Sequence, residues 1–376
     1  MDVSLTGPVH KDKLQNNLTP PAGDRQVDHE RGADYHVQRT PSGVFQFKLT
    51  MAGVETRQFP PHAIPEDLMI RTTGTIFGLS LAFFAASAGA AESLPWPSTV
   101  AEGAKLKVAY ETKSFFEGPT WDPHTTKLYF TAFADSGTQI LRLDGAGKAS
   151  VWMDKSRGAN GTYLSNDGRL LAAQVMNVAI VSIGIGANGP EDVKVLASGG
   201  GGDFGGPNDL CQTPRGDIFF TVPDFGARKS SRVYRLSPQG KVTVVVTDMA
   251  LCNGVRTSMD GRTLYVADSF RKHWRAYPID ADGKVGEGRT FFEPKTDNKW
   301  DPDGFALDEN GVLYLTGMGG IWVVTPEARL LGFIPVPVFA SNATFGGVDG
   351  KTLYITCANK LYSLTMNVRG EHWAGK

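Results

Sequence analysis

Cysteine is scarce in this sequence of 376 residues. The three cysteines, Cys211, Cys252 and Cys357, are too few and too scattered for a disulfide framework or a zinc knuckle. We therefore expect each of them to be buried as a small apolar residue. An excess of one charge is also missing, because 38 basic residues balance 39 acidic ones. This balance gives no reason to expect a nucleic-acid or polyanion partner.

A sustained helical pattern is also lacking after residue 92. Apolar residues form short runs rich in Val, Leu, Ile and Tyr, and no period of 3.6 persists. Glycine, in contrast, is abundant at 44 residues, and 22 prolines add further breaks. Short strands separated by many turns are the expected result, so the composition favours an all-β fold.

Residues 1–68 are polar, charged and contain proline, with no sustained period, and 2–36 has almost no apolar cluster. Such a segment cannot bury enough apolar surface to offset the entropy lost on ordering. We expect it to be disordered, or to be upstream sequence that is not translated, with the true start at Met69.

The stretch 69–91 has the three parts of a secretory signal peptide. A positive charge at Arg71 precedes an apolar run over 76–86, and Ala88-Gly89-Ala90 matches the small-residue cleavage pattern. A transmembrane anchor is the alternative, but 76–91 is 16 residues and a spanning helix needs roughly 20. We therefore predict a mature chain that starts near Ala91 or Glu92, without integral membrane contact, in the periplasm or outside the cell.

One pattern of residues recurs six times between residues 117 and 364. Each copy opens with a short polar motif, here called a marker, and successive markers lie 39 to 50 residues apart. Spacings of this size suit four-stranded propeller blades. The markers are Glu117-Gly118-Pro119, Asn160-Gly161, Pro207-Asn208-Asp209, Asn253-Gly254, Pro302-Asp303-Gly304 and Asn342-Ala343-Thr344.

After each marker comes a turn and then an apolar strand. Most of the turns contain Gly, often after Asp or Asn, as tight hairpins require. The six apolar strands are predicted at 128–130, 170–172, 218–220, 264–266, 313–315 and 353–355. A third strand is expected at 140–143, 233–236 and 321–324, and a fourth at 242–246.

The repeat predicts one domain over 92–376, an all-β six-bladed β-propeller with a central metal site. The last repeat ends without an outer strand, and residues 106–110, before the first marker, could supply it and close the ring. A β-sandwich is the alternative architecture, but sandwiches do not repeat so regularly.

In a propeller, equivalent residues of successive inner strands converge on the central channel. Four markers place oxygen donors there, namely the carboxylates of Glu117 and Asp303 and the amides of Asn208 and Asn253. Oxygen ligands with two negative charges suit Ca²⁺, and less specifically Mg²⁺ or Mn²⁺, whereas Zn²⁺ normally prefers nitrogen or sulfur ligands. A hydrated polar tunnel without a metal is the alternative. Ser269 and His273 are close in sequence, but we interpret both as surface or packing residues.

These motifs resemble those of the SMP-30/gluconolactonase family of six-bladed propellers, over roughly residues 116–364. The most specific parts are 116–119, 206–209, 253–269, 302–304 and 344–354. The resemblance implies that Glu117, Asn253 and Asp303 bind one divalent metal ion, and that Asn208 binds metal or substrate. Ca²⁺ is the ion favoured, with Zn²⁺, Mn²⁺ or Mg²⁺ as other possibilities.

The sequence also departs from the family pattern in the expected substrate wall. Gly206 stands where many aldonolactone-cleaving relatives have Arg, and Ala173-Gln174-Val175 replaces a Cys-Glu-His run. Thr221-Val222-Pro223 stands where Thr-Asp-Pro is common. The metal set is intact while the substrate wall is altered, so the resemblance implies hydrolysis of a small-molecule sugar lactone, as in gluconolactonases, without identifying gluconolactone as the substrate.

The expected chemistry is hydrolysis of a cyclic ester by metal-activated water. Asp303 is the expected general base, Glu117 a permanent ligand, and Asn208 a substrate-orienting residue. One alternative is hydrolysis of phosphotriesters or other esters at the same metal. Another is a non-catalytic propeller that binds a ligand or protein on its top face, for which 269–275 is a candidate segment.

Overall fold

The computed structural model describes residues 34–39, 45–50, 94–135 and 137–373, and the chain divides into two units, 1–64 and 65–376. In the first unit, β1 (Asp34–Arg39) and β2 (Phe45–Thr50) form an antiparallel pair. The remainder of the segment expected to be disordered or untranslated, and all of the predicted signal peptide at 69–91, lie outside the described residues.

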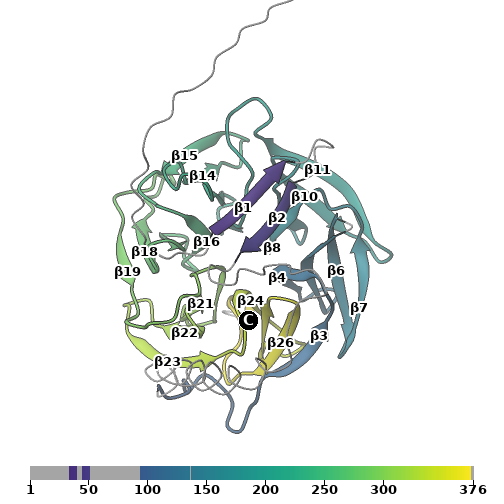
Figure 1. Ribbon diagram of the computed structural model, residues 1–376, viewed down its shortest axis with the longest axis vertical. Coiled ribbons are helices and arrows are strands. Elements are labelled where there is room, and N and C mark those ends of the chain that lie inside the picture. The colour runs from purple at the N-terminus through teal and green to yellow at the C-terminus, as the bar shows by residue number, and fades with distance from the viewer. Residues whose placement is uncertain (1–33, 40–44, 51–93, 136, 374–376) are drawn as a thin grey trace, which may run out of the picture. The chain divides into compact units, whose positions relative to one another are not determined.

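The second unit is a β-propeller of six four-stranded antiparallel sheets (Figure 1). The first three blades are β4 (Phe115–Asp122), β5 (Lys127–Ala134), β6 (Gly137–Gly145) and β7 (Lys148–Met153); β8 (Ala159–Leu164), β9 (Leu170–Gln174), β10 (Ala179–Ile185) and β11 (Pro190–Ser198); and β12 (Leu210–Gln212), β13 (Ile218–Val222), β14 (Arg232–Leu236) and β15 (Val242–Val246).

The next two blades continue this order. They are β16 (Cys252–Thr257), β17 (Thr263–Asp268), β18 (His273–Pro278) and β19 (Arg289–Phe292); and β20 (Phe305–Leu307), β21 (Leu313–Gly317), β22 (Gly320–Val324) and β23 (Leu330–Pro335). The six apolar strands predicted from the sequence are the second strands of their blades, which confirms those assignments.

The sixth blade closes the ring with a strand from the start of the propeller. It consists of β24 (Ala340–Gly346), β25 (Thr352–Cys357), β26 (Lys360–Thr365) and β3 (Lys107–Glu111). The register pairs Leu361 with Tyr110, and the Lys360 ammonium lies 3.1 Å from the Glu111 carboxylate. The predicted closure is therefore confirmed, and it leaves β26 without an exposed edge.

The blades are held together by six apolar clusters, one between each pair of neighbouring sheets. Between blades 4 and 5, for example, Trp274 and Tyr265 pack with Phe305 and Leu313. Side chains of both faces of each sheet are buried in this way, which explains why the second strands are continuously apolar. The three cysteines are free and buried among these clusters, as predicted.

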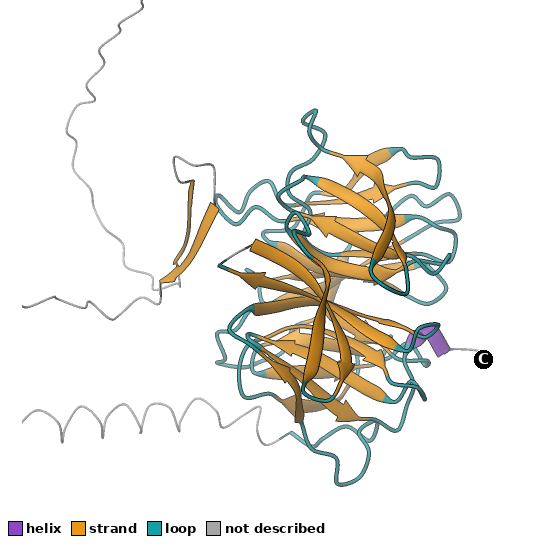
Figure 2. Ribbon diagram, turned by 90° about the vertical axis from the view of Figure 1, so that its right-hand side faces the viewer, coloured by secondary structure: helices purple, strands orange, loops and turns teal. Residues whose placement is uncertain are grey.

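Strand direction gives the propeller two different ends. Each innermost strand begins near its marker. The loops that precede the innermost strands therefore lie at the same end of the propeller as the loops that join second to third strands. We call this end the marker end. The turns between first and second strands lie at the opposite, turn end (Figure 2). A 3₁₀ helix at Glu371–Trp373 also lies at the turn end, where Gly370 N–H donates to the carbonyl of Gly350.

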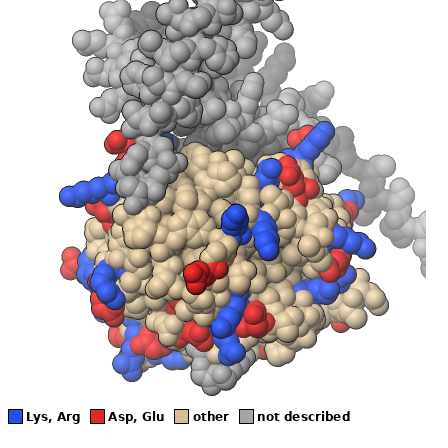
Figure 3. Space-filling model, turned by 90° about the horizontal axis from the view of Figure 1, so that it is seen from below, with Lys and Arg blue, Asp and Glu red and all other residues tan. Residues whose placement is uncertain are grey.

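The face of the molecule seen in Figure 3 is charged but has no block of one sign. Figure 3 shows Lys, Arg, Asp and Glu side chains interspersed on the face in view. Within the described part of the chain, no helix has the length and apolar character to cross a membrane.

Candidate functional site

The markers lie side by side around the channel at the marker end. The amide of Gly161 donates to the carbonyl of Asn208 at 2.8 Å, and the amide of Gly304 donates to the carbonyl of Ser341 at 2.8 Å. A Cβ added to Gly161 would lie 2.1 Å from the Asp209 carboxylate, and one added to Gly304 would lie 2.0 Å from Asn342 Cγ. Glycine is therefore required here by the close approach of neighbouring inner strands.

Asn342 links two carboxylates across the channel. Its Nδ2 donates to Glu117 Oε2 at 3.2 Å and to Asp209 Oδ2 at 3.3 Å. The amide of Ala343 donates to Asn342 Oδ1 at 2.9 Å, which fixes the orientation of the side chain. Residues 225 positions apart in the sequence are thereby joined, so the first and sixth blades meet at this site.

Three carboxylates are buried in this region, and each is driven toward its neutral form. Burial, followed by the charge of Asp209, raises the pKa of Glu117 to about 8. Burial raises the pKa of Asp209 to about 6, although the nearby charge of Arg256 opposes this shift. Burial and the charges of Glu117 and Asp209 raise the pKa of Asp303 well above its ordinary value. A bound cation would relieve this mutual repulsion.

Asn253 presents an unpaired oxygen to the same region. Its Nδ2 donates to Ser269 Oγ at 3.2 Å, and Ser269 Oγ donates to the carbonyl of Pro302 at 2.6 Å. The Oδ1 atom of Asn253 is buried and has no hydrogen-bond partner among the described residues. Such an atom costs free energy unless a ligand satisfies it. Ser269 is thus a buried orienting residue as well as a packing one.

All four residues predicted to form the site lie at the marker end. The charge of Glu117 raises the pKa of Asp303, and Asn253 is held beside Asp303 through Ser269 and Pro302. Asn208 differs from the other three, because its side chain is only partly buried. Its backbone N–H donates to the carbonyl of Thr221, and its carbonyl accepts from the amide of Gly161, so the backbone of Asn208 is fixed on both sides.

Several residues of this region were not predicted to take part. Asn342 and Asp209 belong to markers, so their register was a usable signal. Asn160, the second marker, also has a buried Oδ1 without a partner among the described residues. The buried Arg256 had no such signal, since its strand position resembles those of exposed arginines.

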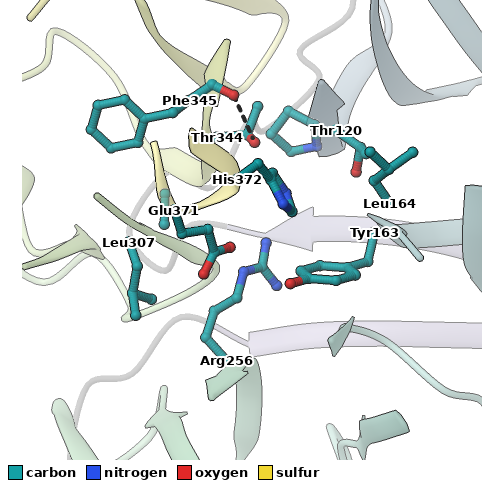
Figure 4. A pocket seen from close by; sticks show the side chains of 11 residues that line it. Thr120, Tyr163, Leu164, Arg256, Leu307, Thr344, Phe345, Glu371 and His372 are labelled. Atoms are coloured by element: carbon teal, nitrogen blue, oxygen red, sulfur yellow. Dashed lines mark hydrogen bonds between the residues drawn. The ribbon is translucent and has the colours of Figure 1, made fainter. Parts of the chain in front are cut away.

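The channel is different at its turn end. There Arg256 lies with Tyr163, Glu371 and His372 along a small pocket (Figure 4). The Arg256 guanidinium carbon is 5.3 Å from the centre of the Tyr163 ring, and its Nη1 donates to the carbonyl of Leu210 at 3.2 Å. The Glu371 carboxylate faces it, so this charge is balanced within the chain.

The donor set at the marker end fits a hard cation. It combines the carboxylates of Glu117 and Asp303 with the unpaired amide oxygen of Asn253, all of them buried. Clusters made of three or more His, Cys, Asp or Glu side chains with metal-binding geometry do not occur in the part of the chain that the structure describes. Any metal held here would therefore need the amide oxygens, a mixed ligand type typical of Ca²⁺.

Comparison with known proteins identifies the family. The model of the SMP-30/gluconolactonase/LRE-like region matches residues 115–359, which include all six markers. The chain belongs to this family.

Three similar proteins show how far this family likeness extends. A gluconolactonase of Zymomonas mobilis is 27% identical over 282 residues, covering 65% of this chain and 76% of the relative. The solved structure of a gluconolactonase of Xanthomonas campestris is 28% identical with a TM-score of 0.61, covering 72% of this chain and 95% of the other. A pentonolactonase of Haloferax volcanii is 27% identical over 249 residues, covering 64% of this chain and 81% of the relative.

Proposed function

We propose that this protein is a hydrolase that opens a lactone ring and depends on a divalent metal ion. The observation that carries the proposal is the set of buried, unneutralised oxygen donors at the marker end, above all the unpaired Asn253 Oδ1. Relatives in the same family that carry the names gluconolactonase and pentonolactonase support the reaction class.

Glu117, Asn253 and Asp303 are the residues that would hold the ion, and Ca²⁺ is the ion favoured. Two carboxylates and an amide oxygen offer only hard oxygen donors, which Ca²⁺ accepts readily and Zn²⁺ does not prefer. A hydrated tunnel without a metal explains the site less well, because it leaves Glu117 and Asp303 with strongly raised pKa values and no counter-charge.

Residues of the site have different roles in the proposed reaction. A bound divalent ion would polarise a lactone carbonyl and make water more acidic. Asp303 takes the proton of the attacking water, and burial among other carboxylates raises its pKa, which makes it a stronger base once ionised. Asn208, whose side chain is partly exposed, orients the oxygens of the substrate. Asn342 holds the Glu117 carboxylate in place by its hydrogen bond.

We also propose that the protein is exported. Residues 69–91 carry the three-part signal pattern, and the propeller is complete without them, since its first paired strand is β3. N-terminal sequencing of the protein from its natural cells should give a start near Ala91 or Glu92. A start before Met69 would contradict export by this route.

The enzyme proposal is tested by turnover. The full chain is stripped of divalent ions and assayed on sugar and simple lactones, without metal and with Ca²⁺, Mn²⁺ or Zn²⁺ added. We expect hydrolysis only with metal, and a loss of roughly 100-fold or more in kcat for Asp303→Asn, since it removes both a ligand and the base. The exposed Asp282 provides the matched control, Asp282→Asn, which should keep full activity.

The outcome also separates the alternatives. Metal binding without turnover of any lactone or ester would support a ligand-binding propeller instead. Turnover of phosphotriesters but not of lactones would show that the proposed substrate class is wrong, while the proposed metal site would stand. Activity that resists metal removal, or that survives Asp303→Asn, would overturn the proposed mechanism.

A further inference from the structure

Large exposed apolar side chains are sorted by position on this propeller. Those on outer strands are aliphatic, the exposed Trp96 lies along the outer strand β23, and among the described residues only Met259 and Val348 occupy turns at the turn end. Three exposed phenylalanines, by contrast, lie at the marker end. They are Phe115, Phe225 and Phe270, with exposed fractions of 39%, 44% and 51%. Exposing a phenylalanine costs hydrophobic free energy, so their gathering at one end calls for a function.

Phe115 belongs to a cluster of rings from three blades. Its ring is stacked on Phe339, with centroids 6.5 Å apart and planes at 17°. Trp300 meets Phe339 edge-on at 6.5 Å, and Phe133 lies 6.4 Å from Phe115. Phe339, Trp300 and Phe133 are only partly buried, so the cluster offers an accessible aromatic surface.

This cluster lies next to the candidate metal ligands along the chain. Phe115 and Glu117 are two positions apart on β4, so their side chains point to the same face, with Cα atoms about 7 Å apart. Phe339 precedes Asn342 by three residues, and Trp300 precedes Asp303 by three. The three rings thus stand over the Glu117 and Asp303 side of the channel mouth.

Apolar side chains also border the opposite side of the mouth. Phe225 and Phe270 lie on the loops between β13 and β14 and between β17 and β18, and Met176, 53% exposed, lies on the loop between β9 and β10. Gly206 packs against the side chain of Val175, where an added Cβ would be 3.0 Å from Val175 Cγ1. The Arg228 guanidinium lies 4.4 Å from the centre of the Phe270 ring, so this side of the mouth combines apolar side chains with a charged group, and the aromatic cluster around Phe115 carries the argument for an apolar substituent.

We propose that the substrate is a lactone or ester with an apolar substituent, whose reacting carbonyl lies at Glu117, Asn253 and Asp303 and whose hydrocarbon part lies on Phe115, Phe339 and Trp300. This inference rests on the proposed hydrolase function and specifies its substrate class. Contact with the rings removes part of the surface of each added CH₂ group from water. Full burial of one CH₂ group increases the binding affinity about fourfold.

The test is a homologous series on the metal-loaded full chain. kcat/KM is measured for γ-lactones whose alkyl substituent grows from none to seven carbons, with D-glucono-1,5-lactone as the polar reference. We expect kcat/KM to rise about two- to fourfold per CH₂ until the substituent outgrows the cluster. The longer lactones should exceed the polar reference by at least tenfold.

Two variants tie the chain-length dependence to the aromatic cluster. Phe115→Thr and Phe339→Thr should each flatten the rise in kcat/KM toward onefold per CH₂. Trp96→Thr is the matched control, because Trp96 is an exposed aromatic that lies along the outer strand β23, where Pro95 accepts a hydrogen bond from Phe333. This control should keep the wild-type slope, and thermal unfolding checks that all variants are folded.

The possible failures are distinguishable. If the wild-type protein hydrolyses the polar reference well and shows no rise along the series, the apolar-substrate inference is wrong and the hydrolase function stands. A rise that persists in both Phe variants would also overturn it. If no lactone or ester is hydrolysed with any added metal, the proposed function fails and this inference fails with it.

Discussion

The three carboxyl groups at the marker end lie in an environment that disfavours their charged forms. Glu117, Asp209 and Asp303 are all buried, and Asp303 has no cationic partner among the described side chains. Burial raises the pKa of all three, and neighbouring carboxylates add to the rise for Glu117 and Asp303. Burying charged carboxylates lowers the stability of the folded protein. Binding of protons or of a metal ion to these carboxylates would restore that stability.

The pKa of Glu117 predicts how stability depends on pH without metal. Its folded-state value is about 8 and its ordinary value is 4.5, so the folded protein retains a proton that the unfolded chain releases between these values. The free energy of unfolding should therefore fall as pH rises from about 5 to about 8, by up to about 1.4 kcal/mol per pH unit for this group. In Glu117→Gln, the fall should be smaller.

The measurement is urea unfolding in the presence of a chelator at pH 5, 6, 7 and 8. Added Ca²⁺ should stabilise the wild-type protein most at pH 8, where the carboxylate is free to bind it. Identical pH slopes in the wild type and Glu117→Gln would show that Glu117 does not titrate in this range.

At the scale of elements, the site depends on how closely the inner strands approach. A methyl group on Gly304 would overlap the Asn342 side chain, with 2.0 Å to Cγ, whereas one on Gly145 would meet no atom within 4 Å. Gly304→Ala must therefore displace Asn342 and break its bonds to Glu117 and Asp209. We expect a loss of about 2–4 kcal/mol in the free energy of unfolding.

Gly145→Ala is the matched control and should change stability by about 0.5 kcal/mol or less. Thermal unfolding of both variants compares them directly. Equal melting temperatures would mean that the strands separate easily at this point, which would weaken the case for a preorganised site.

The elements themselves were largely predictable from the sequence. Apolar runs and glycine-containing turns are local signals, and they placed β5, β9, β13, β17, β21 and β25 as well as the closing strand β3. The 3₁₀ helix at Glu371–Trp373 was missed, since three residues carry no periodicity.

The site was predictable only in part, because it depends on directions of side chains. The equivalent positions of the markers in successive repeats indicated that Glu117, Asn253 and Asp303 share one end of the channel. They gave no information on whether the Oδ1 atom of Asn253 is unpaired, since the side chain is oriented by the bond from Nδ2 to Ser269, 16 residues away. The link from Asn342 to Glu117 spans 225 residues and has no local signal at all.

At the scale of the whole molecule, the two ends of the channel differ in how far their buried polar groups are satisfied. At the turn end, Glu371 and His372 of the 3₁₀ helix line a small pocket, and the charge of the buried Arg256 is balanced by Asp209 and Glu371. The marker end carries the unsatisfied donors and the aromatic cluster. Access to the site is therefore expected from the marker end, which is also where the substrate would be bound.

The most direct test of a metal centre at the marker end is calorimetric titration of Ca²⁺ into the metal-stripped full chain at pH 7, in two buffers with different ionisation enthalpies. We predict one ion per chain with proton release, because the raised pKa of Glu117 leaves it protonated before binding. Binding should be lost in Asn253→Ala and kept in the control Asn310→Ala, whose exposed side chain lies in a turn at the other end. No binding by the wild type, or unchanged binding by Asn253→Ala, would contradict the central claim.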